Sequence, residues 1–291
     1  MKSRILWNGA ILFLVMAFDT VWTAETEESQ DKSRYHFFNP TPSEIARDMS
    51  TDRPDKTESP YTIDAGHYQL EASFLDYSTD RHNPDGSQIE TEIFNIMPAN
   101  LKIGLLNNLD LQLIISPYIA EKTKEEGSSD DKKTGFGDIQ TRMKFNLWGN
   151  DEGKTALAVM PFVKFPTNGA NLGNDAVEGG LIVPLSVELS KGWSLGFMME
   201  LDARQNSADE HYHTEFINSV TFGHQMIGRL KGYTEFFSNI SDENNTDWIA
   251  TVDAGLTYAM TPDIQIDGGV NIGVTKAADD LNPFCGLSVR Y

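Results

Sequence analysis

The chain has 291 residues, of which 40% are hydrophobic, and its formal net charge at pH 7 is -20. Such a negative charge repels phosphate backbones and excludes nucleic acid as a partner. The single cysteine, Cys285, excludes an intrachain disulfide. The sequence has no CxxC, HExxH or P-loop motif, and we expect neither a cofactor nor a bound metal ion.

The first residues have the order of charged, apolar and small residues that is typical of a secretory signal peptide. Lys2 and Arg4 precede an apolar run over residues 5–18, which ends near Ala24. We therefore expect residues 1–24 to be a signal peptide that exports the chain. A membrane anchor is the alternative, but the run is shorter than the roughly 20 residues that span hydrocarbon.

The next stretch, residues 25–64, is polar, and two prolines near residue 40 rule out a long regular element. Ser43 can cap a short helix that ends at Met49. We expect residues 25–64 to form a periplasmic lead-in or a partial plug of the domain that follows. The alternative is a disordered tail as far as Ser50.

Residues 51–63, in the second half of this stretch, are of the types that favour turns. Pro54 and Pro60 fix φ and lack N–H donors, and short polar side chains between residues 51 and 63 bond to nearby backbone. The sequence therefore predicts an ordered, irregular approach segment, which tunes selectivity if it folds into a pore. Its candidate functional residues are Asp52, Arg53, Pro54, Asp55, Thr57 and Glu58.

From Gly66 to the last residue, apolar and polar side chains alternate in short runs, which is the period-2 pattern of strands with one apolar and one polar face. In the first run, Leu70 and Phe74 alternate with Glu71 and Ser73. Twelve such runs predict an all-β domain over residues 65–291. They span residues 66–77, 89–103, 109–115, 138–147, 155–165, 181–189, 193–201, 214–224, 230–240, 248–258, 264–274 and 284–291.

The number and spacing of these strands favour an antiparallel up-and-down β-barrel that crosses a membrane. An even number of strands closes a single-chain barrel with both chain ends on one side. Short turns, such as residues 107–108, alternate with longer polar connections, such as residues 122–134 and 167–177. This asymmetry is typical of periplasmic turns and extracellular loops.

Residues 51–71, TDRPDKTESPYTIDAGHYQLE, resemble the opening motif of the outer-membrane β-barrel family labelled as transporters or as "MetA-pathway of phenol degradation" proteins. Two later blocks are also similar to this family: GFGD at residues 135–138, which a strand with Arg142 and Lys144 follows, and FPTNG at residues 165–169. The resemblance covers residues 41–291. It implies an outer-membrane barrel and does not identify a solute.

The polar face of each strand points into such a barrel, so its charged residues are candidates to line the lumen. The candidate lumen residues are Glu71, Glu92, Lys102, Asp138, Arg142, Lys144, Glu200, Asp202, Arg204, Glu235, Asp253 and Asp267. The acids outnumber the bases, which predicts a lumen that favours cations or neutral solutes over anions. The alternative is a wall of salt bridges that merely fills the barrel, since a barrel of twelve strands lies between filled and open sizes.

The last predicted strand alternates through Leu287, Val289 and the terminal aromatic residue Tyr291. We expect this strand to close the barrel, and the family resemblance implies that it serves as the signal for the barrel assembly machinery.

We therefore expect a passive channel for an unidentified small solute in the bacterial outer membrane, surrounded by lipid and lipopolysaccharide. The alternatives are a closed structural or adhesive barrel and an exported soluble β-sandwich that binds a ligand. We expect no enzyme, because resemblance to lipase barrels would require a His and a Ser two residues apart on a strand, and no histidine has this spacing. His211 and His213 share one face of an extended stretch, but such a pair is more often a solvated loop cluster than a metal site.

Overall fold

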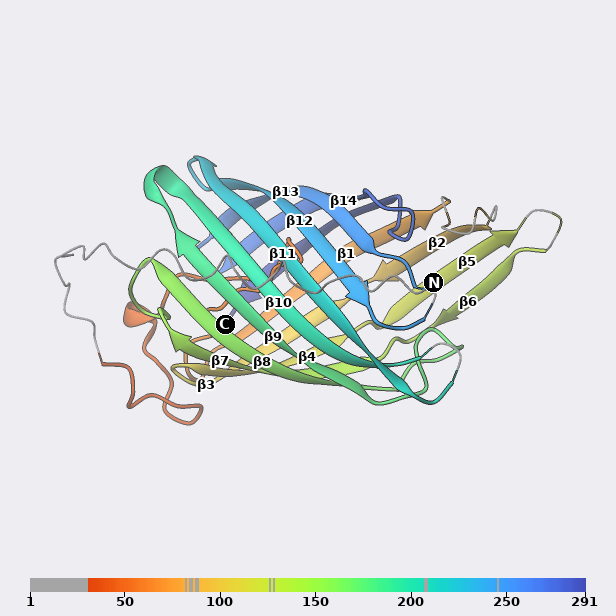
Figure 1. Cartoon of the computed structure of the whole chain (residues 1–291). Coiled ribbons are helices and arrows are strands. Elements are labelled where there is room, and N and C mark those ends of the chain that lie inside the picture. Colours follow the sequence, from red (N-terminus) through yellow and green to blue (C-terminus); the bar gives the residue numbers. More distant parts are fainter. Residues whose placement is uncertain are drawn as a thin grey trace, which may run out of the picture. The chain divides into compact units, whose positions relative to one another are not determined.

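The computed structural model describes residues 31–81, 83, 86, 89–125, 127, 129–206, 209–244 and 246–291. Their strands form one antiparallel sheet that closes on itself, because the last strand, β15 (Leu281–Arg290), pairs with the first, β1 (Tyr68–Asp80) (Figure 1). The closed ring confirms the predicted barrel and excludes the β-sandwich. The predicted signal peptide, residues 1–24, lies outside the described residues.

Within the described residues the ring contains twelve strands, three of which are interrupted. The interrupted strands are β2 (Ile89–Ile96) with β3 (Ala99–Leu106), β4 (Leu109–Ile115) with β5 (Tyr118–Glu125), and β6 (Asp131–Gly135) with β7 (Ile139–Trp148). The continuous strands besides β1 and β15 are β8 (Thr155–Phe165), β9 (Glu178–Glu188), β10 (Trp193–Gln205), β11 (Tyr212–Ile227), β12 (Leu230–Ser241), β13 (Ile249–Thr261) and β14 (Ile264–Gly273). No helix in this part of the chain is both long and apolar enough to cross a bilayer.

The first interruption corrects the prediction of one continuous strand over residues 89–103. Met97, with a φ of 59°, and Pro98 separate β2 from β3. Pro98 has no N–H to donate to a sheet, so the ladder is interrupted there, although β2 and β3 pair with β1 in the same register. As a result Phe94 in β2 and Leu101 in β3 both face outward, although they are seven positions apart and an uninterrupted strand would put them on opposite faces.

The two faces of the barrel wall differ in polarity. In β1 the inward-facing Gln69, Glu71 and Ser73 are buried, whereas Leu70 and Phe74 are 38% and 51% exposed on the outside. The same outward exposure of apolar side chains continues around the ring at Leu111, Met143, Leu181, Phe216, Val252 and Ile272. Polar inside and apolar outside is the reverse of a soluble protein, and it indicates that the barrel spans a membrane.

The connections at the two ends of the barrel differ in length. At one end, which we call the turn end, residues 107–108, 149–154, 189–192, 228–229 and 262–263 join the strands, and one of these turns contains the 3₁₀ helix η2 (Ser190–Gly192). At the other end, which we call the loop end, the connections are residues 81–88, 126–130, 166–177, 206–211, 242–248 and 274–280.

One predicted loop is shorter than expected. Residues 122–134 were predicted as a loop, but β5 and β6 extend into this stretch and pair with each other. Cross-strand charges stabilise the extension, because Lys124 lies 3.0 Å from Glu90 and from Glu92, and Lys133 lies 3.4 Å from Glu121. The mixed charges that suggested a solvated loop are therefore partners between neighbouring strands, β5 with β2 and β5 with β6.

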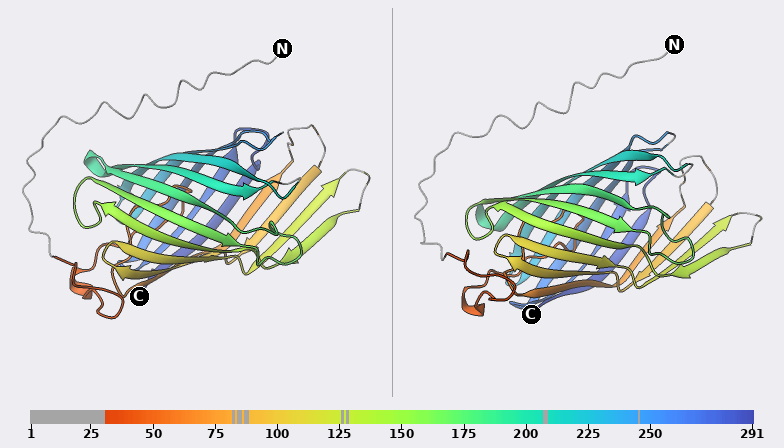
Figure 2. Two further views of the ribbon diagram at one scale, coloured as in Figure 1. Left: turned by 60° about the horizontal axis from the view of Figure 1, so that its bottom comes forward. Right: turned by 90° about the horizontal axis from the view of Figure 1, so that it is seen from below.

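The described chain begins at the turn end and runs into the ring before β1 starts (Figures 1 and 2). Its regular structure is one turn of 3₁₀ helix, η1 (Ser43–Ile45), and no side chain caps it. The predicted helix as far as Met49 is wrong, because the chain is extended at Ala46 and the Arg47 N–H donates to the Asp64 carboxylate at 2.8 Å. A tertiary contact thus replaces the helical hydrogen bond.

Candidate functional site

Residues 51–62, which we call the lumen segment, contact the inward-facing side chains of the barrel. Glu71 on β1 accepts hydrogen bonds from the backbone N–H groups of Asp52 at 3.0 Å and Arg53 at 3.1 Å. Glu235 on β12 does the same for Lys56 at 2.9 Å and Thr57 at 2.8 Å. Two glutamates from different sides of the barrel thus supply the acceptors that an irregular buried backbone needs.

One side of the lumen, which we call the basic wall, consists of Lys102 on β3 with Arg142 and Lys144 on β7. The Asp52 carboxylate lies 2.5 Å from the Lys102 Nζ and 2.7 Å from the Lys144 Nζ, and Glu58 pairs with Arg142. Lys102 and Lys144 are 1% and 0% exposed, so both ammonium groups depend on these partners. Burial opposes ionisation of Asp52, but the charges of the two lysines outweigh it and hold the pKa of Asp52 well below its ordinary value.

The other side, which we call the acidic wall, consists of Glu235 on β12, Asp253 on β13 and Asp267 on β14. Arg53 binds both oxygens of Asp267, with Nη2 at 2.6 Å and Nε at 3.2 Å. The Lys56 Nζ lies 3.4 Å from an Asp253 oxygen. Two acids of the lumen segment, Asp52 and Glu58, therefore face the basic wall, and its two bases face the acidic wall.

A second group of contacts fixes the chain on either side of the lumen segment at the turn end. Arg47 lies 3.3 Å from Asp64 and 3.0 Å from Asp151. Asn150 accepts the Thr62 N–H at 3.0 Å. Gly104 on β3 allows this close approach, since a Cβ there would overlap the Asp64 carbonyl. Both ends of the segment are thus held where the chain enters the barrel.

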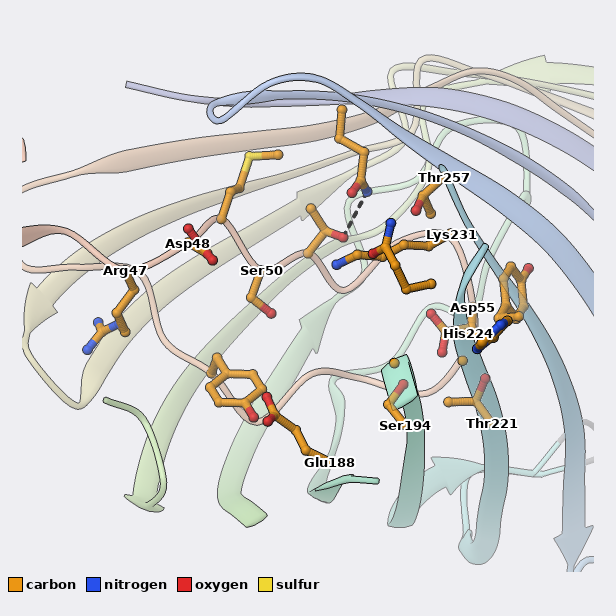
Figure 3. Close-up of a pocket in the computed structure, with 18 of the residues that line it drawn as sticks. Arg47, Asp48, Ser50, Asp55, Glu188, Ser194, Thr221, His224, Lys231 and Thr257 are labelled. Atoms are coloured by element: carbon orange, nitrogen blue, oxygen red, sulfur yellow. Dashed lines mark hydrogen bonds between the residues drawn. The ribbon is translucent and has the colours of Figure 1, made fainter. Parts of the chain in front are cut away.

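A cavity of about 830 Å³ lies between the lumen segment and the turn end of the barrel (Figure 3). Asp55 of the segment borders it together with Thr221 on β11 and Lys231 on β12. Burial and, next to it, the carboxylate of Glu235 raise the pKa of Asp55 well above its ordinary value. A negative charge on Asp55 thus opposes docking of the segment.

A second cavity, of about 120 Å³, lies toward the loop end. Residues along the inward face of β10 show how the two cavities are arranged. Ser194 lines the first cavity, Met198 accepts a hydrogen bond from the Glu58 N–H, and Glu200 and Asp202 line the second cavity. The lumen segment and the side chains around Met198 therefore separate the cavities. The second cavity also contains charges of both signs from Arg142, Lys164, Glu178 and Arg204.

The barrel brings together most of the predicted lumen residues. Seven contact the lumen segment: Glu71, Lys102, Arg142, Lys144, Glu235, Asp253 and Asp267. The other three that face inward, Glu200, Asp202 and Arg204, line the second cavity. Their effect on a solute stays a prediction.

Two predicted lumen residues lie elsewhere. Glu92 shares the outward face of β2 with Phe94 and accepts a hydrogen bond from the Tyr77 hydroxyl at 3.1 Å, because the interruption at Pro98 reverses which residues of the strand face inward. Asp138 lies between β6 and β7, where it accepts the N–H groups of residues 167 and 168, both at 3.0 Å. Asp138 thus joins the GFGD block to the FPTNG block and holds a loop.

The approach residues also take up distinct places. Asp52, Arg53 and Glu58 form the ion pairs described above, the Thr57 hydroxyl lies 2.6 Å from that of Ser219, and Pro54 borders the larger cavity with Asp55. Lys56 was not among the predicted approach residues, although its positive charge lies between the negative charges of Asp55 and Glu58 in the sequence.

An apolar cluster inside the barrel was also missed. It consists of Met160, Phe162, Ile182, Met198 and Ile217, with Phe237 packed against it. The expectation of a polar inward face concealed these residues. The sequence signal was present, because residues 159–163 and 181–185 are apolar at nearly every position, which is typical of strands buried on both faces.

The terminal strand completes the ring through its backbone. Tyr291 and Tyr68 exchange two hydrogen bonds, at 2.8 and 3.0 Å, while Val289 pairs with Leu70 and Leu287 with Ala72. Recognition of this strand by the assembly machinery stays a prediction. Within the described residues, no group of three or more His, Cys, Asp or Glu side chains is arranged to hold a metal ion.

Comparisons with known proteins give a family and several barrels. Residues 51–291 match the model of the family described as "Putative MetA-pathway of phenol degradation". No curated protein matches the chain significantly. Among solved structures, the transport unit of the autotransporter AIDA-I from Escherichia coli has a TM-score of 0.49 at 11% identity and covers 84% of this chain and 92% of its own.

Two further solved structures are channels. The NanC porin has a TM-score of 0.48 at 12% identity, over 76% of this chain and 98% of its own. The CymD monoaromatic hydrocarbon channel has a TM-score of 0.41 at 8% identity, over 77% of this chain and 87% of its own. These scores are low, so the barrel fold rests on the strand pairing of the chain itself.

Proposed function

The chain belongs to the family described as "Putative MetA-pathway of phenol degradation", and we propose that it is a channel of the bacterial outer membrane through which small solutes pass passively, with the lumen segment as its plug. The observation that carries this proposal is the kind of contact that holds the segment. Ion pairs and hydrogen bonds to polar walls dominate, and water can replace such bonds at a modest net cost. The plug can therefore leave while the hydrogen-bonded ring stays intact.

The dimensions of the barrel support this function. Eight strands make a barrel that side chains fill, and 16 to 18 strands leave a water-filled channel. A ring of twelve strands encloses enough space for a peptide segment, and here cavities of about 830 and 120 Å³ lie on its two sides. Withdrawal of residues 51–62 joins these cavities into one path. The apolar cluster around Met198 then lies between the two cavities on that path.

The family description refers to a pathway and leaves the solute open. In the lumen, acids outnumber bases, so we assign a preference for cations and neutral solutes. The partners in this account are outer-membrane lipid and lipopolysaccharide, the barrel assembly machinery and a small solute, and we assign no enzymatic activity.

Recordings in planar bilayers test the proposal. Purified wild-type protein should open rarely, whereas the double variant Asp52→Asn/Glu58→Gln, which removes both acids that face the basic wall, should have a higher open probability. Asp48→Asn is the control, because Asp48 is an exposed acid of the same lead-in that has no ion pair within the described chain. If neither the wild type nor the double variant conducts where a known porin does, the closed structural or adhesive barrel is the better account.

A further inference from the structure

Both cations of the lumen segment are held by a carboxylate and an aromatic ring together. The guanidinium carbon of Arg53 lies 5.8 Å from the centre of the Phe284 ring, while its nitrogens bind Asp267 at 2.6 and 3.2 Å. The Arg53 Nη1 also donates to the Ser73 hydroxyl at 2.6 Å. We call Asp267, Phe284 and Ser73 the arginine cage.

Lys56 has an equivalent environment. Its Nζ lies 4.5 Å from the centre of the Phe237 ring, 3.4 Å from an Asp253 oxygen and 2.8 Å from the Thr251 hydroxyl. We call Asp253, Phe237 and Thr251 the lysine cage. An aromatic face next to a carboxylate attracts a cation more strongly than either group alone, because the quadrupole of the ring adds to the charge.

The wall itself is shaped for these cations. Asp253 is 0% exposed, and its Oδ1 has no hydrogen-bond partner among the described residues, so this acid has acceptor capacity that Lys56 does not use. Gly286 on β15 leaves the space that the Arg53 guanidinium occupies, since a Cβ there would overlap it. Glu235 adds a third inward-facing acid to this wall. When the segment leaves, three acids face the lumen without the two cations that neutralised them.

We propose that the two cages are cation subsites of the channel, and that small solutes with a guanidinium or primary ammonium group bind there in competition with Arg53 and Lys56. The lumen segment is then an internal mimic of the solute. This inference rests on the proposed function in one respect, namely that the segment leaves the lumen. It deepens that function by naming organic cations as the solute class.

Calorimetry on the folded, purified full-length protein in detergent tests the inference, with agmatine as the probe, because it has a guanidinium at one end and a primary ammonium at the other. The wild type should bind weakly, since the segment occupies the cages. Arg53→Gln/Lys56→Gln should bind at least about tenfold more tightly, because occupation by the segment no longer lowers the apparent affinity. Sodium chloride at equal ionic strength controls for screening, and neutral pentanamide controls for length.

Variants of the wall locate the binding. In the Arg53→Gln/Lys56→Gln background, Asp253→Asn/Asp267→Asn should abolish binding of agmatine. Asp130→Asn/Asp131→Asn removes two exposed acids near the loop end and should leave binding unchanged. Phe237→Leu/Phe284→Leu keeps both carboxylates and should weaken binding several-fold. This aromatic pair carries the test if the acid variants do not fold.

Two results would overturn the inference. One is no binding of agmatine to folded Arg53→Gln/Lys56→Gln protein, and the other is equal binding with and without the cage residues. Failure of this inference can be distinguished from failure of the proposed channel function, because binding of agmatine in detergent does not require conduction. A protein that conducts without binding agmatine refutes the cages alone, whereas one that binds agmatine and never conducts refutes the channel alone.

Discussion

Asp52 is the residue whose change should release the lumen segment most directly. Its two oxygens bind two buried ammonium groups, at 2.5 and 2.7 Å. In Asp52→Asn, Lys102 keeps its pair with Glu71, while Lys144 keeps a hydrogen bond of 3.4 Å to the Tyr61 carbonyl. Removing one partner of a buried ion pair costs about 3–5 kcal/mol, and the remaining partners favour the lower end of that range.

A cost of about 3 kcal/mol lowers the docking equilibrium of the segment roughly 100-fold, since each 1.4 kcal/mol is a factor of about ten. Hydrogen exchange measures this equilibrium, because the N–H groups of residues 52, 53, 56 and 57 bond to wall carboxylates. In Asp52→Asn these amides should exchange up to about 100-fold faster, while the amides of β8 to β10 keep their protection. Asp48→Asn should leave the exchange rates of the segment amides and of the strand amides unchanged.

Two results would refute this reasoning. Unchanged exchange of the segment in Asp52→Asn would mean that the ion pairs to the basic wall do not hold it. Equal acceleration of the segment and the strands would mean that the segment and the barrel unfold as one unit, in which case the segment cannot act as a plug.

Three further predictions concern pH, assembly and selectivity. Because the folded pKa of Asp55 is raised above its ordinary value of 3.8, its protonation favours docking; this contribution is complete below pH 3.8 and is lost as pH rises through the raised pKa. The protection of the segment amides, corrected for intrinsic exchange, should therefore fall from pH 4 to pH 8 in the wild type. Asp55→Asn should weaken this dependence, and Glu58, whose pKa burial also raises, accounts for the remainder. Leu287→Arg places a charge on the outward face of the closing strand, at a cost of up to about 4 kcal/mol at the bilayer midplane, so heat-modifiable gel mobility should show less folded barrel than for Leu287→Met; equal folded fractions would contradict an outward position. Glu200→Gln/Asp202→Asn should shift the zero-current potential in a salt gradient toward anions, whereas Glu125→Gln at the loop end should shift it less, and equal shifts would contradict a selective role for the second cavity.

Alternation along the chain was sufficient to predict the barrel, because each strand has one face toward the polar lumen and one toward lipid. The interruptions were not predicted, because one inserted irregular residue leaves the hydrophobic pattern almost unchanged while it reverses the face of every residue beyond it. Glu92 was misplaced for this reason. Pro98 and Pro117 mark two of the interruptions in the sequence.

The sequence was sufficient to predict which charged residues form the candidate site, but not which of them form ion pairs with each other. Asp52, Arg53 and Glu58 stood out as charges in a stretch with turn chemistry, and their partners stood out as charges on polar faces. Which acid meets which base depends on where the segment enters the ring, and Arg53 and Asp267 are 214 residues apart in the chain. Local patterns contain no information on such distant contacts.

A reversible tether between the lumen segment and the wall tests most directly whether the segment closes the channel. The hydroxyls of Thr57 and Ser219 lie 2.6 Å apart, so cysteines in their places are within reach of a disulfide. The variant is Thr57→Cys/Ser219→Cys in a Cys285→Ser background, which removes the one native cysteine. In planar bilayers the oxidised protein should not conduct, and adding a reductant to the same membrane should start openings. Equal conductance before and after reduction would contradict the account.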